Sequence, residues 1–395
     1  MQGPKAFLLK HHRRVQMKLL HISDLHIGKR VNSYSMIEDQ KYILDQILQI
    51  TDRERPDAVL VAGDVYDKSV PSEEAVDLFD WFLVRLVQRK QEVFVVSGNH
   101  DSAERLSFAH KIMDACNVHF SPVYEKGAVS CMLHEGLKDE VRIHLLPFVK
   151  PANVRAKYPE ETIDSYTGAV SAAVSHMDID KEKVNILVAH QFVTGAERCD
   201  SEEISVGGLD NVDASAFADF DYVALGHLHG PQSVSRDTIR YAGSPLKYSF
   251  SEEKQHKSVT LVEIAGKGAV SVREAELKPQ RDMVTVRGTF NELMAKDFYE
   301  SGTLQDDYVR VILTDEDDIP DAMTKLRTVY RNVMELRYDN MRTRNNVSLR
   351  QLEEIEALSP QKLFSDFYAA MNGQEMSREQ EKIVDDLVKK IWEEK

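Results

Sequence analysis

Five short segments of this chain carry side chains that bind divalent cations. They are Asp24-Leu25-His26, Gly63-Asp64-Val65-Tyr66-Asp67, Gly98-Asn99-His100-Asp101, His190 and Gly226-His227-Leu228-His229. The ligands expected among them are two carboxylates, one amide oxygen and four imidazoles, contributed by Asp24, Asp64, Asn99, His26, His190, His227 and His229. Two adjacent divalent ions need roughly this set of ligands if one carboxylate bridges them. The residue types therefore predict two-metal chemistry, most simply the hydrolysis of phosphate esters.

Each of these segments follows a short run of β-branched and aliphatic residues. The runs cover residues 18–23, 57–62, 92–97, 183–189 and 222–225. Such runs are typical of strands that are buried on both faces, and ligands bind at the carboxyl ends of strands in sheets of this kind. A single Asp-x-His occurs often by chance, whereas five strands that each end on a polar ligand predict one shared site.

The chemistry of each side chain suggests how the two ions are shared. Asp64 is the expected bridging ligand, because only a carboxylate has two oxygens that can bind two cations about 3.5 to 4 Å apart. Asp24 and His26 are two residues apart and can both reach one ion. His227 and His229 have the same spacing and can divide between the two ions.

Asn99 offers a neutral oxygen, which keeps the charge of the site low enough to accept an anionic phosphate. A mixed nitrogen and oxygen set without cysteine favours manganese, iron or zinc over calcium. His100 adjoins Asn99 and is better placed as a non-ligand. A protonated imidazole there can stabilise a pentacoordinate phosphorus or protonate the leaving oxygen. Asp67 can orient that imidazole as a carboxylate–histidine pair.

Composition narrows the class of protein. The chain is 42% hydrophobic and 29% charged, which fits a globular protein in solution. No segment approaches the roughly 18 to 20 apolar residues that cross a bilayer, so we expect no membrane association. The three cysteines are odd in number and lack any CxxC spacing. They predict reduced thiols in the cytoplasm rather than a disulfide framework or a thiolate metal site.

The formal net charge of −15 does not favour binding of nucleic acid. One stretch departs from this acidic average, because residues 325–350 contain seven basic residues against two acids. It is either a solvated helix face with an exposed strand edge, or a phosphate-contacting surface of a second domain. In the second case the expected DNA contacts are Lys325, Arg327, Arg331, Arg342 and Arg344.

The pattern of apolar residues divides the chain into four parts. Residues 1–16 are basic without any acid and are expected to be a disordered extension. Residues 17–277 alternate strands and helices and then form hairpins, which predicts an α/β fold built as a two-sheet β-sandwich flanked by helices. Residues 278–350 predict a small α+β capping domain. Residues 351–395 predict two amphipathic helices, which either cover the protein or dock on a partner.

The motifs D-x-H, GDxxD, GNHD, H and GHxH resemble those of the calcineurin-like metallophosphoesterase superfamily. The resemblance covers roughly residues 18–250 and implies two cations. It implies that one is held by Asp24, His26, Asp64 and His229, and the other by Asp64, Asn99, His190 and His227. It also implies that His100 is the catalytic acid and is paired with Asp67.

Within that superfamily, residues 17–29 and 243–250 and the small second domain resemble the SbcD family of bacterial nuclease subunits. That resemblance implies a manganese-dependent DNA exonuclease and endonuclease, with 3′-5′ exonuclease and single-strand endonuclease activity, in DNA repair and recombination. It implies a homodimer, formed through the large domain, inside a heterotetramer with an SMC-like ATPase of the SbcC type. The capping domain would contact DNA, and the terminal helices would bind the base of the partner's coiled coil.

At two positions the sequence differs from the motifs of other branches of the superfamily, which argues against membership in those branches. Lys68-Ser69 follow GDxxD where protein phosphatases carry an arginine-glycine pair, and Asp67 stands where purple acid phosphatases carry a tyrosine ligand. Ser244 is expected in a strand-to-loop turn near the site and has no assigned role.

Two alternative functions remain. A stand-alone nucleotide phosphodiesterase should close its pocket with an aromatic and apolar lid, whereas a DNA cap should expose arginine and lysine. Residues 325–350 favour DNA. A non-catalytic scaffold should lack at least one ligand, and none is missing from the five motifs.

Overall fold

The computed structural model describes residues 17–124, 129–133, 140–197, 199, 202, 211–300, 302–341, 343, 364–365, 368–369 and 376–393. The predicted extension at residues 1–16 and most of the first predicted terminal helix lie outside these residues. The chain forms two compact units, Met1–Gln280 and Arg281–Lys395.

The first unit contains a six-stranded mixed sheet in the order β14-β13-β1-β4-β5-β6. Its strands are β1 (Met17–Ile22), β4 (Ala58–Ala62), β5 (Glu92–Val96), β6 (Val118–Phe120), β13 (Ser258–Gly266) and β14 (Ala269–Glu276). The strands β1, β4, β5 and β6 run parallel, and β13 is antiparallel to both of its neighbours. The carboxyl ends of β1, β4 and β5 therefore share one edge of this sheet.

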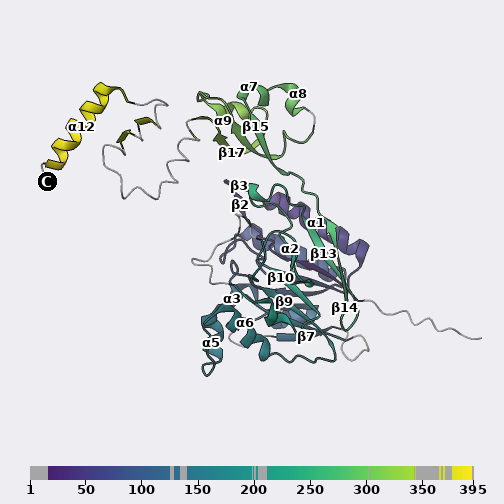
Figure 1. Cartoon of the computed structure of the whole chain (residues 1–395). Coiled ribbons are helices and arrows are strands. Elements are labelled where there is room, and N and C mark those ends of the chain that lie inside the picture. Colours follow the sequence, from purple (N-terminus) through teal and green to yellow (C-terminus); the bar gives the residue numbers. More distant parts are fainter. Residues whose placement is uncertain are drawn as a thin grey trace, which may run out of the picture. The chain divides into compact units, whose positions relative to one another are not determined.

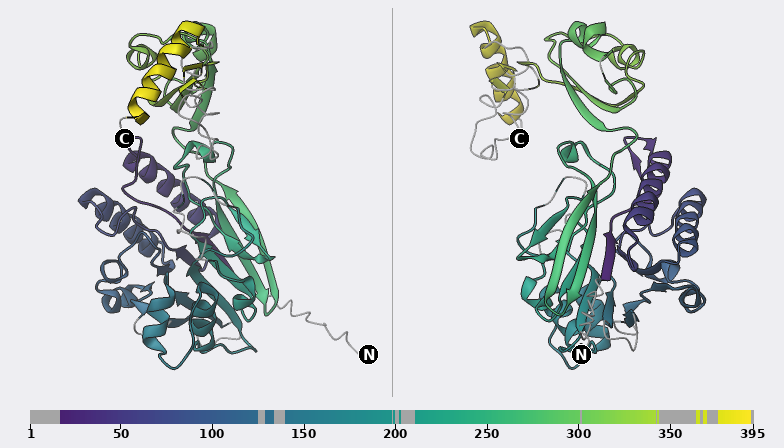
Figure 2. Two further views of the ribbon diagram at one scale, coloured as in Figure 1. Left: turned by 60° about the vertical axis from the view of Figure 1, so that its left-hand side comes forward. Right: turned by 90° about the vertical axis from the view of Figure 1, so that its right-hand side faces the viewer.

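Two helices cover the outer face of this sheet. Helices α1 (Ile37–Glu54) and α2 (Glu73–Gln88) lie side by side there (Figure 2). In α1 the apolar side chains at helical spacing, such as Ile43 and Ile47, are buried as predicted. Ser72 caps α2 as predicted, because its hydroxyl accepts a main-chain N–H of the first turn.

A second six-stranded sheet has the order β11-β12-β10-β9-β8-β7. Its strands are β7 (Val129–Leu133), β8 (Val141–Leu146), β9 (Val184–His190), β10 (Tyr222–Gly226), β11 (Gln232–Val234) and β12 (Arg236–Tyr241). The strands β8, β9, β10 and β12 run parallel. Helices α5 (Pro151–Lys157) and α6 (Tyr166–Ser175) pack on this sheet through a cluster that includes Val154, Val170 and Val223.

The two sheets face each other across a shared core. Leu60 and Phe94 from the first sheet pack with Val188 and Tyr222 from the second. Strand β4 contacts both β9 and β10. This arrangement confirms the predicted α/β class and the two-sheet sandwich. It also brings the carboxyl ends of β1, β4 and β5 next to those of β9 and β10.

Shorter elements join these strands. They are β2 (Arg30–Val31), β3 (Tyr34–Ser35), α3 (Ala103–Leu106), α4 (His110–Met113) and the 3-10 turns η1 (Asp114–Cys116), η3 (Ala214–Phe217) and η4 (Phe250–Glu252). Among the described helices, none combines the length and the apolar character that spanning a membrane requires.

The second unit has a sheet and a core of its own. Its three parallel strands, β15 (Met283–Gly288), β16 (Tyr308–Leu313) and β17 (Asn332–Tyr338), are flanked by α7 (Phe290–Leu293), α8 (Lys296–Tyr299) and α9 (Ala322–Leu326) (Figure 1). Its buried cluster includes Val309, Val311 and Tyr330. The final helix, α12 (Arg378–Glu393), begins after Ser377, whose hydroxyl accepts the N–H of Gln380 as expected of a cap.

Candidate metal centre

The five motif segments meet where β1, β4, β5, β9 and β10 end. Main-chain hydrogen bonds join the first two segments, from Asp24 N–H to the Gly63 carbonyl (3.0 Å) and from His26 N–H to the Asp64 carbonyl (2.9 Å). The His227 N–H donates to the Asp24 carboxylate at 3.0 Å, which ties the last segment to the first. The sandwich therefore places polar side chains from both sheets in one buried region.

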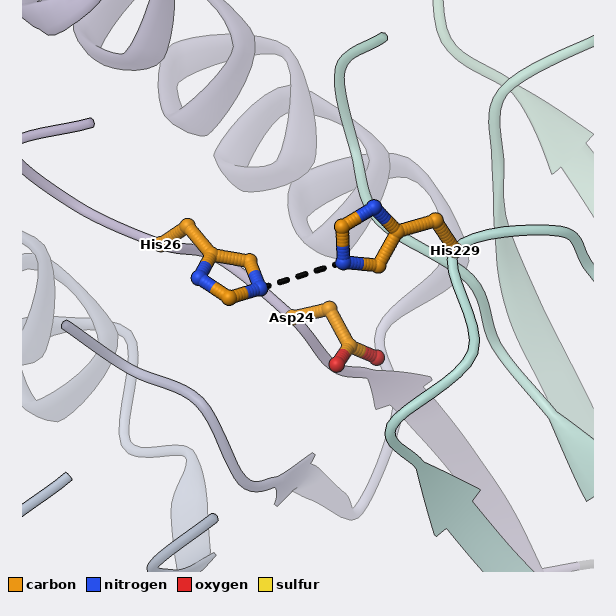
Figure 3. Close-up of side chains that lie close together, drawn as sticks. All are labelled: Asp24, His26 and His229. Atoms are coloured by element: carbon orange, nitrogen blue, oxygen red, sulfur yellow. Dashed lines mark hydrogen bonds between the residues drawn. The ribbon is translucent and has the colours of Figure 1, made fainter. Parts of the chain in front are cut away.

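One group of donor atoms consists of Asp24, His26 and His229. Their ligand atoms all lie within 4.8 Å of one another. The Nε2 atoms of His26 and His229 face each other at 3.1 Å, beside the Asp24 carboxylate (Figure 3). At this distance two unprotonated nitrogens would repel each other, so either one donates a proton to the other or both bind a cation between them. This group fits a divalent cation with mixed nitrogen and oxygen ligands.

A second group gathers around Asn99. Its Oδ1 lies 3.0 Å from His190 Nε2 and 3.0 Å from His227 Nδ1. The other ring nitrogen of His190 donates to the Ala62 carbonyl at 2.8 Å. Because Nδ1 is the donor, Nε2 is the nitrogen that can bind a cation once it has lost its proton. The neutral amide and the two imidazoles form a second set of cation donors.

The Asp64 carboxylate lies between the two groups. Its Oδ2 is 3.7 Å from His26 Nε2, 3.3 Å from His190 Nε2 and 4.0 Å from His100 Nε2. Its Oδ1 accepts the His100 main-chain N–H at 2.9 Å. One oxygen of this carboxylate is therefore close to both donor groups, a position from which the carboxylate can contribute to two cations.

The backbone at the centre is strained. Asp24, His26, Asp64 and His227 have φ angles of 52°, 43°, 48° and 105°. Residues other than glycine rarely adopt this left-handed region of backbone conformation. Each such residue lowers the free energy of unfolding by on the order of 1–3 kcal/mol. The surrounding sandwich holds all four in place, and strain concentrated in this way is typical of functional sites.

Glycines allow the strands to approach one another closely. A Cβ added to Gly226 would lie 1.8 Å from the Ala62 carbonyl oxygen and 2.7 Å from His190 Nδ1. A Cβ on Gly98 would lie 2.0 Å from Asp64 Oδ1. The glycines of the GNHD and GHxH motifs are therefore needed for the close packing around the donors.

Burial shifts the pKa values of the first donor group. It raises the pKa of Asp24 to about 6, because a charged carboxylate is disfavoured away from water. It lowers the pKa of His26 to about 3, so this imidazole is neutral at physiological pH. Within the described residues, His26 Nδ1 makes no hydrogen bond and faces Asp67 Oδ1 at 3.6 Å. A neutral His26 with Nε2 directed at the group suits a metal ligand.

The pKa values of two other histidines are raised rather than lowered. Burial alone would lower the pKa of His190, but the facing Asp64 carboxylate outweighs it and the pKa is raised to about 9. Burial opposes the shift of His229 as well, yet contacts with Cys199 and Glu252 raise its pKa to about 10. Without a cation the centre therefore holds protons at these two rings.

His100 and Asp67 lie together, but not through the predicted pair of side chains. His100 Nδ1 lies 3.1 Å from the main-chain carbonyl oxygen of Asp67. The Asp67 carboxylate is 2.6 Å from Lys29 Nζ. The predicted carboxylate–histidine pair is thus replaced by a contact with a main-chain oxygen, because the neighbouring lysine attracts the carboxylate. His100 Nδ1 still has an acceptor, and Nε2 faces the centre.

Several carboxylates that hold the motif segments in place were not predicted from the sequence. Asp101 accepts the main-chain N–H groups of Tyr66 and Gly98, both at 2.9 Å, and so joins two segments. Glu202 accepts the His229 N–H at 2.6 Å. Asp101 is the last residue of GNHD and could have been assigned from the motif. Glu202 lies outside every motif, and no sequence signal identifies it.

The basic side chains predicted to contact DNA belong to the second unit. Lys325 is exposed on α9. Arg327 donates to a main-chain carbonyl at 3.2 Å, and Arg331 forms an ion pair with Asp306. These two guanidinium groups make contacts within their own unit, and their role in DNA binding stays a prediction. The remaining two predicted contacts lie outside the described residues: Arg342 and Arg344.

Two family models and several known proteins match this chain. A family model described as calcineurin-like phosphoesterase matches residues 17–231, and one described as type 5 capsule protein repressor C-terminal domain matches residues 279–372. The D component of the nuclease SbcCD from Staphylococcus epidermidis is 32% identical over 371 residues, which cover 92% of this chain and 96% of that relative. The protein of the same name from Staphylococcus saprophyticus is 29% identical over 382 residues, 96% of this chain and 99% of the relative.

Among solved structures, a dimetal phosphatase from Danio rerio covers 66% of this chain and 99% of its own length. Its TM-score is 0.39 and its sequence identity 13%, a likeness too low to support any statement about function.

Replacing Gly226 by alanine should disrupt the centre. The new Cβ would overlap the Ala62 carbonyl and press on His190, so β10 would have to move away from β4. Overpacking of this kind costs about 1–3 kcal/mol or more, which we expect to see as a lower free energy of unfolding in urea. Gly168→Ala in α6 is the matched control, because its Cβ would meet nothing closer than Ser165 Oγ at 3.3 Å. Equal effects of the two substitutions would contradict this explanation.

Proposed function

We propose a nuclease function for this chain, which belongs to the calcineurin-like phosphoesterase family and, within it, to the SbcD family of nuclease subunits. The observation that carries the proposal is the position of the Asp64 carboxylate between two separate groups of cation donors. Hydrolysis of a phosphodiester bond is the reaction for which such paired donors are suited.

In this proposal two divalent cations bind at the centre. Asp24, His26 and His229 would hold one, Asn99, His190 and His227 would hold the other, and Asp64 would contribute to both. Manganese is the expected metal, because the mixed nitrogen and oxygen donors suit manganese, iron or zinc and the resemblance to the SbcD family implies manganese. When bound, such a pair of cations lowers the pKa of water and neutralises charge on the phosphate.

His100 is proposed to supply the proton for the leaving oxygen. Its Nδ1 faces the Asp67 carbonyl at 3.1 Å, which fixes the plane of the ring. Nε2 then lies 4.0 Å from Asp64 Oδ2, so a phosphate bound by cations at Asp64 would be near this nitrogen. In the protonated imidazole, Nδ1–H donates to the carbonyl and Nε2 carries the proton that is transferred.

Asp67 supports this arrangement with its main chain and its side chain. Its carbonyl orients His100, and its carboxylate faces His26 Nδ1 at 3.6 Å. A carboxylate on that side favours a proton on Nδ1 and leaves Nε2 of His26 for the cation. Lys29 balances the charge of this carboxylate from 2.6 Å. The proposed catalytic role of Asp67 is therefore indirect.

The expected substrate is DNA, and the expected partner is an SbcC-type SMC-like ATPase. Support comes from the two staphylococcal relatives, which are named as one component of a nuclease called SbcCD. The side chains of Ile383 and Leu387 on α12 are exposed, as a helix that docks on another protein requires. We extend the proposal to a homodimer within a heterotetramer, to exonuclease and endonuclease activity in DNA repair and recombination, and to the cytoplasm.

A stand-alone nucleotide phosphodiesterase is the second candidate. The observation in its favour is that Arg327 and Arg331 are engaged within the second unit. A capping domain whose arginines are already paired offers less positive surface to a phosphate backbone.

His100→Ala should abolish most of the nuclease activity. We expect cleavage of an end-labelled linear duplex with Mn²⁺ and the partner ATPase to fall about 10²- to 10⁴-fold, because the leaving oxygen loses its proton donor. Bound manganese should stay at the level of the wild type, since His100 is not a proposed ligand. His110→Ala is the control histidine on the neighbouring helix α4 and should cleave normally.

Two results would contradict the proposal. Normal cleavage by His100→Ala would remove the residue from the chemistry. Efficient hydrolysis of bis-p-nitrophenyl phosphate without any DNA cleavage by the wild type, with the partner present, would favour the nucleotide phosphodiesterase.

Manganese binding should release protons and strengthen as the pH rises. The pKa values of His190 and His229 are raised to about 9 and about 10, whereas a metal binds only the neutral imidazole. Each ring must therefore lose a proton, and the apparent affinity should increase from neutral pH toward about pH 10. Calorimetric titrations in two buffers with different ionisation enthalpies measure the protons released. Identical heats in both buffers would contradict the proposed ligands.

A further inference from the structure

The segment 243–257 follows β12 and has no role in the proposal so far. It begins at Gly243-Ser244, which the sequence places near the site without a function, and it includes η4. Two of its side chains, Glu252 and Lys257, contact His229. In Figure 3 one ring nitrogen of His229 faces His26, and the other points away from both Asp24 and His26.

Glu252 lies behind that second nitrogen. Its side chain is fully buried, and Oε1 is 3.4 Å from His229 Nδ1. The same oxygen accepts the Tyr248 N–H at 3.1 Å, and Oε2 is 3.4 Å from Ser244 Oγ. The carboxylate is thus held in one orientation from several sides, with an oxygen directed at the imidazole.

Lys257 supplies the positive charge that pairs with the Glu252 carboxylate. Only 4% of its surface is exposed, and its ammonium is 2.5 Å from Glu252 Oε2. It also donates to the main-chain carbonyl of His229 and to Ser244 Oγ, both at 2.9 Å. A buried ammonium is costly unless its protons are all satisfied, and this one has enough acceptors. Lys257 therefore fixes the backbone of His229 while Glu252 contacts its ring.

We infer that Glu252 and Lys257 are positioning residues, a buried ion pair that directs His229 Nε2 at the cation shared with Asp24 and His26. This role rests on the proposed two-metal function. A carboxylate hydrogen-bonded to the far nitrogen of a ligating histidine sets the tautomer and increases the basicity of the ring. The lysine keeps the pair neutral, so the carboxylate acts on His229 without adding net negative charge.

The ion pair makes the two cation positions unequal. Among the described contacts of Glu252 and Lys257, the only proposed ligand is His229, whereas His190 is oriented by the Ala62 carbonyl. Loss of the ion pair should weaken the position held by Asp24, His26 and His229. The position held by Asn99, His190 and His227 should keep its affinity. A merely structural role would lower the stability of the protein without this selectivity.

The test is a manganese titration of the full chain followed by electron paramagnetic resonance. The wild type should bind two Mn²⁺ and give the spectrum of a coupled pair. Glu252→Gln should bind one of them about 10- to 100-fold more weakly and give a mononuclear spectrum at one Mn²⁺ per chain. Because this variant leaves the Lys257 ammonium buried without its counter-charge, Glu252→Gln/Lys257→Met is measured beside it and should show the same loss.

Asp221→Asn is the matched control. Asp221 is a buried carboxylate with a lysine partner, Lys267 at 2.9 Å, and it precedes β10, whereas His227 and His229 follow that strand. The Asp221→Asn variant should bind both cations as the wild type does. Its thermal stability should nevertheless fall about as much as that of the Glu252 variants. Binding of both cations by the two Glu252 variants with wild-type affinity, or equal weakening of both positions, would overturn the inference. A wild type that binds fewer than two Mn²⁺ would instead overturn the proposed function and this inference with it.

Discussion

The rest of the centre depends on one buried carboxylate, that of Asp64. Only 2% of this residue is exposed, and one of its oxygens lies within 4.0 Å of three imidazole nitrogens. An isolated charge in such a position is strongly disfavoured. The proton on His190 reduces this cost when no metal is present, and the proposed cations would do so when they are bound. The same residues therefore either hold protons or bind metal, and the two states compete.

The sandwich provides what this carboxylate needs. Strands from both sheets end around it, and four of the residues there adopt left-handed backbone that the chain would otherwise avoid. Glycines at the strand ends remove the Cβ atoms that would keep the segments apart. Buried carboxylates such as Asp101 then bind main-chain N–H groups of neighbouring segments. Burial of apolar side chains between the sheets stabilises the fold and offsets the free-energy cost of this strained, polar region.

The fold class and the meeting of the five segments at one site could be predicted because both depend on local pattern. Buried strands are visible as apolar runs, and each donor comes directly after one of them. The partners of those donors could not be predicted, because they are set by tertiary contacts without periodicity. Lys29 attracts the Asp67 carboxylate, so that His100 meets a main-chain carbonyl instead. Glu252 ends the 3-10 turn η4, and Lys257 directly precedes strand β13. Charged residues at such positions are usually solvated.

The most direct test of the two-metal centre is a crystal structure with manganese, with the metal located by anomalous scattering. We expect two peaks about 3.5 to 4 Å apart that both contact Asp64. One should also contact Asp24, His26 and His229, and the other Asn99, His190 and His227. A single peak, or two peaks that do not share Asp64, would contradict the two-metal centre.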